Sequence, residues 1–312
     1  MKKIAPYLIL FAAMLWATDA PFRIKLTQEL PSGFIVLAEH FVDVLIVAPL
    51  LWWNRAVLKN LKTKQWLAIL AIAIGGSALA SVAFTQAFHY VNPSVAILLQ
   101  KLQPLIAIGL AGTLLKERMG KHFWVWAAIA LVGAYVITFP GLVPQTYPGE
   151  QFSPNLIGAG LALLAALLWG ASTVLGRYVL GSVDFKVMTG LRFTLAFVFL
   201  LGFNLIQNTI PPLASVLARD WFYILIIAIA SGVVSLFLYY RGLKDTKASI
   251  ATLAELGFPM AAVVVNWIFI PGSGLAWPQV AGIALLLFSI YKLSGVNVSE
   301  ASSDMRGAEI VS

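Results

Sequence analysis

Long apolar stretches alternate with short polar segments along the whole chain. A helix that crosses a membrane needs about 20 predominantly apolar residues. Stretches of that length, each bounded by charged residues or by Pro, Gly and Asn, fall at 5–24, 33–53, 66–89, 94–115, 122–140, 155–177, 185–207, 220–240, 248–270 and 276–294. This pattern predicts an all-α integral membrane protein with ten transmembrane helices.

Both ends of the chain need separate interpretation. Lys2 and Lys3 precede the first apolar run, as in a secretory signal peptide. The same run has a counterpart later in the chain, so we expect it to be retained. Residues 295–312 are polar and of mixed charge, which predicts a disordered cytoplasmic tail.

The composition agrees with a lipid environment and narrows the chemistry. Hydrophobic residues make up 60% of the 312 residues and charged residues 11%, whereas soluble domains carry roughly 25% charged residues. The sequence has no Cys and three His, which excludes disulfides and thiolate metal sites and indicates no metal cluster. No Walker-type phosphate-binding motif is present, so we expect no nucleotide or other cofactor.

Basic residues set the expected orientation. Three of them (Arg23, Lys25 and Arg219) fall in outer loops and two (Lys101 and Arg192) inside spans, while the other 16 of 21 fall in cytoplasmic segments. Because cytoplasmic loops carry an excess of Lys and Arg, this split predicts that both termini are cytoplasmic, in the cell inner (plasma) membrane. The same rule accounts for the net charge of +8, so we expect no nucleic acid partner.

The two halves of the chain repeat one another. Leu15-Trp16-Ala17 recurs as Leu168-Trp169-Gly170, Gln100 aligns with Glu255, and Pro104 aligns with Pro259. The expected domains are five-helix repeats at 1–142 and 155–294, an outer linker at 143–154 and the tail at 295–312. Because five is an odd number of crossings, the second repeat enters the membrane in the opposite orientation. Inverted repeats of this kind place a substrate site near the bilayer midplane.

Several of these motifs are similar to those of a known family. The Leu-Trp element of each half, Asn92-Pro93-Ser94, Gln103-Pro104-Leu105 and Leu115-Lys116-Glu117-Arg118 together resemble the EamA-type repeat of the drug/metabolite transporter superfamily. The resemblance implies ten helices in a 5+5 inverted repeat, with a central cavity lined mainly by helices 1, 3, 4, 6, 8 and 9. It also implies export or uptake of amino acids, other metabolites or drugs. Two positions depart from the pattern, since Gly272 stands opposite Glu117 and His40 replaces the arginine present as Arg192.

Ionisable residues inside a membrane span are costly and need an explanation. Within the predicted spans they are Asp19, Glu39, His40, Asp43, Lys101, Arg192 and Glu255. Each is open to two interpretations, either pairing that holds helices together or a role in transport. Glu39 and Asp43 lie one turn apart on one helix face, so these two and Glu255 are candidates for proton coupling. The alternative is that Lys101 or His40 neutralises them.

Two further positions offer contacts to a solute. Trp16 and Asp19 share a helix face, and an indole beside a carboxylate suits an amine-bearing solute through cation–π and charge contacts. The alternative is simple packing of Trp16 between helices. Lys101 either binds a carboxylate of the solute or pairs with an acid of the first two helices.

Prolines mark the sharpest candidate site. Proline frees the carbonyl four residues earlier, so Pro104 frees that of Gln100 and Pro259 that of Glu255, which predicts a hinge or kink in each half. Freed backbone inside a membrane is tolerated where it lines a wet cavity. Gln86 and Tyr239 join the set through the cavity-lining helices of the resembling fold. The expected binding and translocation residues are Trp16, Asp19, Gln86, Gln100, Lys101, Gln103, Trp169, Tyr239, Glu255 and Asn266.

These features favour a secondary transporter, more specifically an exporter, of a small polar metabolite such as an amino acid, working by alternating access. Four intramembrane acids against two bases favour a cationic or proton-linked solute. A passive channel and, with less support, an intramembrane enzyme stay open as alternatives. The expected partners are the solute and the lipid bilayer, with the protein a monomer or a homodimer.

Overall fold

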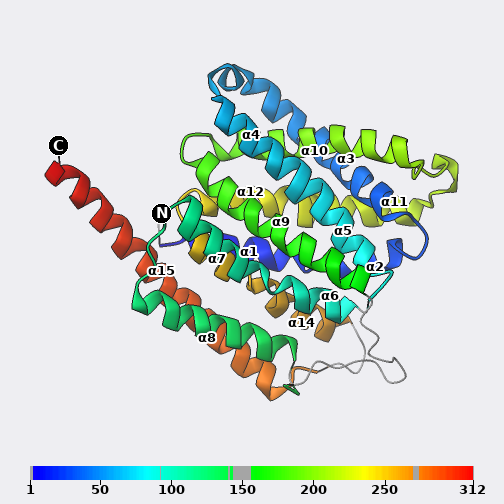
Figure 1. Cartoon of the computed structure of the whole chain (residues 1–312). Coiled ribbons are helices and arrows are strands. Elements are labelled where there is room, and N and C mark those ends of the chain that lie inside the picture. The colour runs from blue at the N-terminus through cyan, green and yellow to red at the C-terminus, as the bar shows by residue number, and fades with distance from the viewer. Residues whose placement is uncertain (1–2, 92, 140, 143–155, 270–273, 312) are drawn as a thin grey trace.

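A computed structural model describes residues 3–91, 93–139, 141–142, 156–269 and 274–311, without the side chains of 93–95, 97, 266, 269 and 298–311. Its described residues form helices and the turns between them, and nine of these helices are long and apolar enough to cross a membrane. Figure 1 shows the helices packed side by side in one bundle.

The order of elements follows the apolar pattern closely. Two 3-10 turns, η1 (Arg55–Asn60) and η3 (Leu213–Ser215), lie in connecting segments. The α-helices are α1 (Ala5–Trp16), α2 (Ala20–Leu26), α3 (Ser32–Trp53), α4 (Thr63–Ala71), α5 (Ala80–Ala87), α6 (Pro93–Gln100), α7 (Gln103–Leu114), α8 (Lys121–Thr138), α9 (Leu156–Leu180), α10 (Phe185–Gln207), α11 (Ala218–Ile226), α12 (Ser235–Leu243), α13 (Ala248–Ala254), α14 (Gly257–Phe269) and α15 (Trp277–Val311).

Two apolar stretches contain a break at the place where proline predicts it. Pro104 is the second residue of α7 and Pro259 the third of α14, and each follows a two-residue turn. Proline removes one backbone N–H and its ring clashes with the carbonyl four residues earlier, which ends the preceding helix. Within the stretch expected at 94–115, residues 98–114 form a shorter apolar helix that contains this turn, beside the nine long ones of the described residues.

A third break was not expected. The sequence pattern predicts one continuous helix over 5–24, but α1 ends at Trp16 and α2 begins at Ala20. Pro21 stands at the start of α2 and cannot continue the hydrogen bonding of α1. The Thr18 hydroxyl donates to the Leu15 carbonyl at 2.7 Å, which occupies one of the orphan acceptors at this helix end. The turn brings Asp19 and Arg23 onto one side of the chain.

Two π-helical segments recur at matching places in the two halves. The segments η2 (Ile72–Leu79) and η4 (Ile227–Val234) each have 8 residues, and their first residues are 155 positions apart. Each continues into an α-helix, α5 or α12. Short π segments inside α-helices are rare and are frequent at functional sites. Here they carry Ser77 and Ser231 toward the interior of the bundle.

A carboxylate joins the two halves at the start of α13. Glu117, from the Leu-Lys-Glu-Arg segment after α7, accepts from the Ala248 amide at 2.7 Å and from the Ser249 amide at 3.0 Å. The first amides of a helix have no intrahelical acceptor, and the positive end of the helix dipole favours an anion. Glu117 therefore caps α13 and fixes the helix that carries Thr252 and leads to Glu255.

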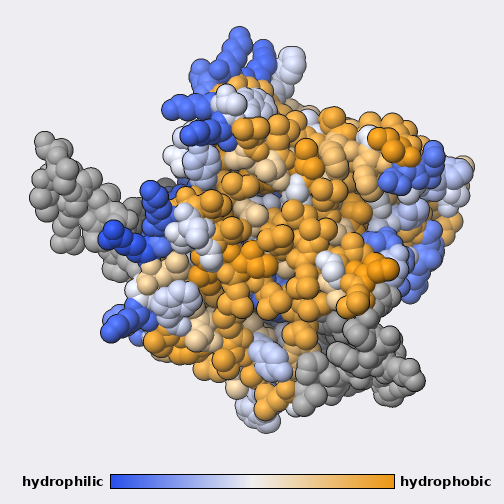
Figure 2. Space-filling model, in the orientation of Figure 1, coloured by the Kyte–Doolittle hydropathy of each residue, from blue (hydrophilic) through white to orange (hydrophobic). Residues whose placement is uncertain are grey.

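The surface agrees with burial in lipid. Figure 2 shows a broad hydrophobic surface, with the hydrophilic residues gathered toward opposite ends of the molecule. Large apolar side chains such as Leu45, Val198 and Phe288 are 50–61% exposed on the outside of the bundle. A soluble protein rarely exposes a continuous apolar surface of this size.

The end of the chain differs from the expected disordered tail. Helix α15 continues through residues 295–311 and extends beyond the rest of the bundle (Figure 1). No proline interrupts this segment, and its Ala, Glu, Met and Arg residues favour helix.

Candidate functional site

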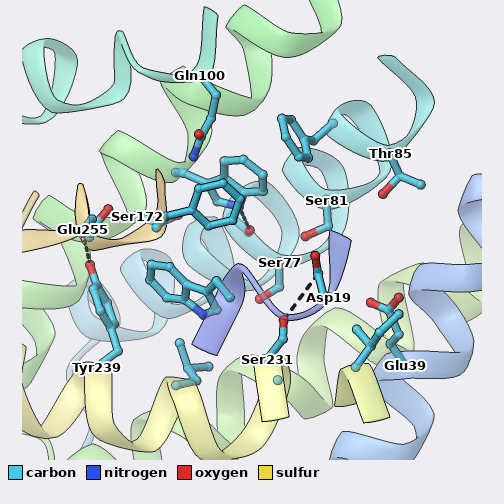
Figure 3. A pocket seen from close by; sticks show the side chains of 18 of the residues that line it. Asp19, Glu39, Ser77, Ser81, Thr85, Gln100, Ser172, Ser231, Tyr239 and Glu255 are labelled. Atoms are coloured by element: carbon cyan, nitrogen blue, oxygen red, sulfur yellow. Dashed lines mark hydrogen bonds between the residues drawn. The ribbon is translucent and has the colours of Figure 1, made fainter. Parts of the chain in front are cut away.

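A cavity of about 210 Å³ lies inside the bundle, where the helix breaks and both π segments meet. Its wall includes residues of α2, α3, η2, α5, α9, α10, η4, α12 and α13, and the turn residues next to the breaks. Figure 3 shows a polar group of side chains on each side of it, with serines between them. The site is therefore built from elements of both halves of the chain.

The first polar group, here called the Glu255 cluster, consists of Gln103, Thr173, Tyr239 and Glu255. Glu255 is 8% exposed and lies in the turn between α13 and α14. One carboxylate oxygen accepts from the Tyr239 hydroxyl at 2.7 Å and from the Thr173 hydroxyl at 3.0 Å. The other accepts from the Gln103 amide at 2.5 Å. Neutral donors from three other helices thus surround this buried carboxylate.

A chain of amides extends the Glu255 cluster. The Gln100 Nε2 donates to Gln103 Oε1 at 3.2 Å, and Gln103 in turn donates to Glu255. Within the described part of the chain, the buried Gln100 Oε1 has no hydrogen-bond partner. A buried acceptor without a donor costs free energy, so a ligand that donates a hydrogen bond to this oxygen gains binding free energy.

The second polar group, here called the Arg23 cluster, consists of Asp19, Arg23, Glu39 and Thr85. Arg23 is 8% exposed and its Nη2 lies 2.8 Å from Asp19 Oδ2 and 3.0 Å from Glu39 Oε2. Its Nη1 donates to the Thr85 hydroxyl at 3.3 Å. The prediction that Arg23 lies in an outer loop is wrong, because the turn before α2 directs this side chain into the cavity wall.

Two carboxylate oxygens, one in the Arg23 cluster and one beside it, accept no hydrogen bond in the described residues. Glu39 Oε1 and Asp43 Oδ1 are buried and, among the residues that the structure describes, have no hydrogen-bond partner. Glu39 and Asp43 are 5% and 2% exposed, and both line the cavity. Asp43 fits against the backbone of η4, where a Cβ at Gly232 would lie 2.5 Å from its Oδ1. In the described residues no ion pair joins Lys101 or His40 to these acids, so the expected neutralisation by either residue is not observed.

The other cations of the cavity contact neutral groups. Lys101 Nζ lies 4.8 Å from the centre of the Phe258 ring, a cation–π contact. Arg192 donates to the Ser77 hydroxyl at 2.6 Å and to the Tyr240 hydroxyl at 2.8 Å. In the described residues Lys101 has no ion pair, so the predicted pairing with an acid of the first two helices is not observed.

Aromatic side chains form the apolar part of the wall. Trp16 contacts Tyr239 with ring centroids 5.3 Å apart, and Trp169 contacts Phe84 at 5.2 Å. The Trp169 indole N–H donates to the Gly76 carbonyl at 2.9 Å in the π segment. Gly76 has no side chain, which allows Ser172 to approach its backbone closely. Planar rings therefore stand beside exposed hydrogen-bonding groups.

The cavity brings together most, but not all, of the residues expected from the sequence. Those that line it are Trp16, Asp19, Glu39, Asp43, Gln100, Lys101, Gln103, Pro104, Trp169, Tyr239 and Glu255. Gln86 is not in the wall, whereas its neighbour Thr85 lines the cavity. Pro259 follows the lining residue Phe258 but does not itself line the cavity. The Asn266 side chain lies outside the described residues.

Several lining residues were not anticipated from the sequence. Besides Arg23, they include the hydroxyl-bearing residues Ser77, Ser81, Thr85, Ser172, Thr173, Ser231 and Thr252. Ser and Thr are common in membrane helices as ordinary packing residues, so their identity carries little signal. The spacing of Ser77, Ser81 and Thr85 by four residues was the one available clue.

The lining side chains offer groups that can bind a small molecule. Among the described residues, no group of three or more His, Cys, Asp and Glu is arranged to hold a metal ion. The arrangement offers stacking surfaces, hydrogen-bond donors and acceptors, and both signs of charge. Such a pocket suits a small molecule with a planar part and a polar part.

Comparisons with known proteins show related sequences over nearly the whole chain. A profile of the EamA-like transporter family matches residues 3–139 and again 156–295. The riboflavin transporter ImpX of Fusobacterium nucleatum is 32% identical over 300 residues, which cover 93% of this chain and 97% of that protein. An uncharacterized transporter of Synechocystis is 25% identical over 264 residues, 82% of this chain and 73% of its own. A crystal structure 17% identical, covering 94% of this chain and 98% of that one, matches the fold with a TM-score of 0.71.

Proposed function

This chain belongs to the EamA-like transporter family. We propose that it is a secondary transporter that carries a flavin such as riboflavin through the central cavity. Membership of this family, together with relatives that are named as transporters, indicates a multi-pass cell-membrane transporter rather than an enzyme. The substrate proposal rests on the combination of stacking rings and hydrogen-bonding groups in one cavity, and the riboflavin transporter among its relatives supports it.

A flavin needs two kinds of surface. Its three-ring isoalloxazine is planar and packs against aromatic faces, which Trp16, Trp169 and Phe84 offer. The ring also carries an imide edge with one N–H donor between two carbonyl acceptors. The unpartnered Gln100 Oε1 and the Lys101 ammonium, adjacent at the break after α6, supply an acceptor and a donor for that edge.

The burial of Arg23 changes the charge argument for an amino acid. The sequence suggested four intramembrane acids against two bases, but Arg23 raises the number of bases in the cavity wall to three, with Lys101 and Arg192. Asp19 and Glu39 are already paired with that guanidinium. The excess of negative charge is smaller, and an amine-bearing solute loses much of its support.

Alternating access between two inverted five-helix repeats is the proposed mechanism, with both termini cytoplasmic. The family profile matches the chain twice, and the two π segments and two proline breaks recur at corresponding places. Discontinuous helices that meet at a midplane site are typical of carriers whose halves rock against each other. Rocking would expose the same cavity first to one side and then to the other.

Counterflow in proteoliposomes tests the proposal. Vesicles loaded with unlabelled riboflavin should take up labelled riboflavin with saturation, and excess unlabelled riboflavin outside should compete, whereas a channel gives flux that does not saturate. Glu255→Gln and Gln100→Ala should each lower the rate about 10-fold, the scale of one lost buried hydrogen bond. Matched controls are Glu29→Gln and Gln207→Ala, which change exposed residues outside the cavity. Unchanged transport in both cavity variants would refute the site.

The same vesicles address energy coupling and direction. Glu39, Asp43 and Glu255 are the proposed proton-coupling residues, because all three are carboxylates buried in the cavity wall. If transport is proton-coupled, an imposed pH gradient should drive flavin accumulation, and without coupling the flavin gradient alone sets the direction. Export, the direction favoured by the sequence, predicts net movement toward the face opposite the termini.

A further inference from the structure

We infer that the cavity holds a flavin in one orientation, with its sugar-alcohol chain against a hydroxyl row and the carboxylates beside it, so that the protein selects flavins by this chain. The inference rests on the proposed function and deepens it, because it assigns the part of the cavity that recognises the polyol. The hydroxyl row is defined as Ser77, Ser81 and Thr85.

The hydroxyl row lies on one face of the third span. Its members are four residues apart, Ser77 in η2 and the other two in α5, and all three line the cavity. Two helical turns between the first and the last correspond to about 11 Å. Figure 3 shows Ser77, Ser81 and Thr85 in succession along the wall, with Asp19 and Glu39 beside this row. A row of this kind runs parallel to an extended chain of vicinal hydroxyl groups.

The middle member of the row has unused hydrogen-bonding capacity. Ser77 accepts from Arg192 at 2.6 Å and Thr85 accepts from Arg23 at 3.3 Å. Within the described residues the Ser81 side chain makes no hydrogen bond, although it lines the cavity. A serine hydroxyl can donate one hydrogen bond and accept others, and a sugar alcohol needs both at each carbon.

Unpartnered carboxylate oxygens provide a second and independent indication of a ligand. Glu39 Oε1 and Asp43 Oδ1 belong to cavity-lining residues that are 5% and 2% exposed. Figure 3 shows the Glu39 carboxylate turned toward Asp19 and Thr85, beside the hydroxyl row. Carboxylate oxygens only accept, so they match a ligand that brings several O–H donors. The pattern fits a polyol and does not fit an apolar tail.

The Glu255 cluster is a poorer place for the same chain. Its carboxylate already accepts from Gln103, Thr173 and Tyr239, so most of its capacity is used. Nearby, the unpartnered Gln100 Oε1 and the Lys101 ammonium, which contacts the Phe258 ring, suit the imide edge of the flavin ring. The ring therefore lies toward Gln100 and the polyol toward Glu39, with the aromatic wall between.

This orientation has a consequence for charge. The end of the chain, which carries the phosphate in flavin mononucleotide, would lie near Asp19, Glu39 and Asp43 with Arg23 as the balancing cation. A phosphate brings a charge of about −1.5 to −2. Three acids against one base repel that group, so the cavity should accept riboflavin and reject its phosphate ester.

Binding to the purified full-length protein in nanodiscs tests the orientation, read by quenching of flavin fluorescence. Three ligands share one ring and differ only in the chain: riboflavin, lumiflavin with a methyl group in its place, and flavin mononucleotide. Riboflavin should bind at least about 10-fold more tightly than either of the others. Lumiflavin loses the hydrogen bonds of the chain, each worth roughly 3- to 10-fold, and the phosphate of flavin mononucleotide is repelled by the acids. Equal affinity for lumiflavin, or for flavin mononucleotide, would overturn the inference.

Removing the Ser81 hydroxyl tests the orientation of the flavin more sharply. Ser81→Ala should weaken riboflavin about 3- to 10-fold and leave lumiflavin unchanged, since it removes a contact to the chain alone. The matched control is Ser289→Ala in α15, a buried serine whose hydroxyl donates to the Leu285 carbonyl and does not line the cavity. Equal weakening of both ligands by Ser81→Ala contradicts the orientation. Absence of binding and transport for every flavin would instead refute the proposed function, and the inference with it.

Discussion

The two sides of the cavity hold buried carboxylates in different ways. In the Glu255 cluster three neutral donors surround one acid, whereas in the Arg23 cluster one guanidinium lies between two acids. Neutral donors can rearrange when a proton or a ligand arrives. A buried ion pair depends on both of its charges, because removing one leaves the other desolvated and uncompensated. The comparison predicts that the Arg23 cluster is essential for stability and that the Glu255 cluster tolerates loss of its charge.

Removing the guanidinium should have the largest effect. Arg23→Ala leaves the buried Glu39 and Asp43 and the partly buried Asp19 without the cation beside them, and should reduce the free energy of unfolding by about 3–5 kcal/mol. Thermal unfolding of the purified protein measures the change. Arg55→Ala is the matched control, because Arg55 is exposed and contacts the Trp52 carbonyl and ring, so no buried acid loses its cation and the unfolding temperature should stay close to that of the unmodified protein.

Neutralising the whole Arg23 cluster separates charge from packing. Arg23→Met combined with Asp19→Asn and Glu39→Gln should recover most of the lost stability, since no unpaired charge is then buried. If the triple variant is as unstable as Arg23→Ala, packing around the guanidinium, and not its charge, holds this side together.

Crowding the Asp43 carboxylate should have an intermediate effect on stability. In Gly232→Ala the new methyl would lie 2.5 Å from Asp43 Oδ1, and overpacking of this kind costs about 1–3 kcal/mol. Gly202→Ala in α10 has nothing within 4 Å of its new methyl and should stabilise by up to about 1 kcal/mol. Chemical or thermal unfolding of both variants gives the comparison.

A double variant identifies the contact responsible. Asp43→Ala should relieve the cost of Gly232→Ala, because the two changes share one contact. Additive losses in the double variant would show that Asp43 is not the neighbour that matters.

Neutralising Glu255 should have the smallest effect on stability. Glu255→Gln should change the free energy of unfolding by less than about 1 kcal/mol, because the amide chain can reverse its direction. Gln103 and Gln100 would each turn their amides, and the unpartnered Gln100 Oε1 would then face a donor. Glu255→Ala removes the acceptor of the Gln103 amide and leaves the Thr173 and Tyr239 hydroxyls only their mutual hydrogen bond, and should cost about 1–3 kcal/mol. Equal losses in the two variants, by thermal unfolding, would contradict the proposed reversal.

The sequence anticipated the breaks in α6/α7 and α13/α14, because proline acts locally and its position is visible. It missed the break at Pro21, since the short polar segment around Arg23 has the composition of a loop. Gln86, expected in the cavity wall from the resemblance, does not line it, and the reason is different. One residue rotates a helix by about 100°, and the upstream π segment shifts the face that later residues present, so spacing alone does not identify the lining side.

Hydropathy, charge distribution and proline positions by themselves determined that this chain is a helical membrane protein with two related halves and polar residues near the helix breaks. These features are local or additive along the chain. Only the tertiary structure decided which charges meet, that Arg23 lies between Asp19 and Glu39 while Glu255 is held by neutral groups, and that the hydroxyl row faces the cavity. Such pairings depend on how helices distant in sequence are rotated against one another, and that rotation is set by packing of the whole bundle.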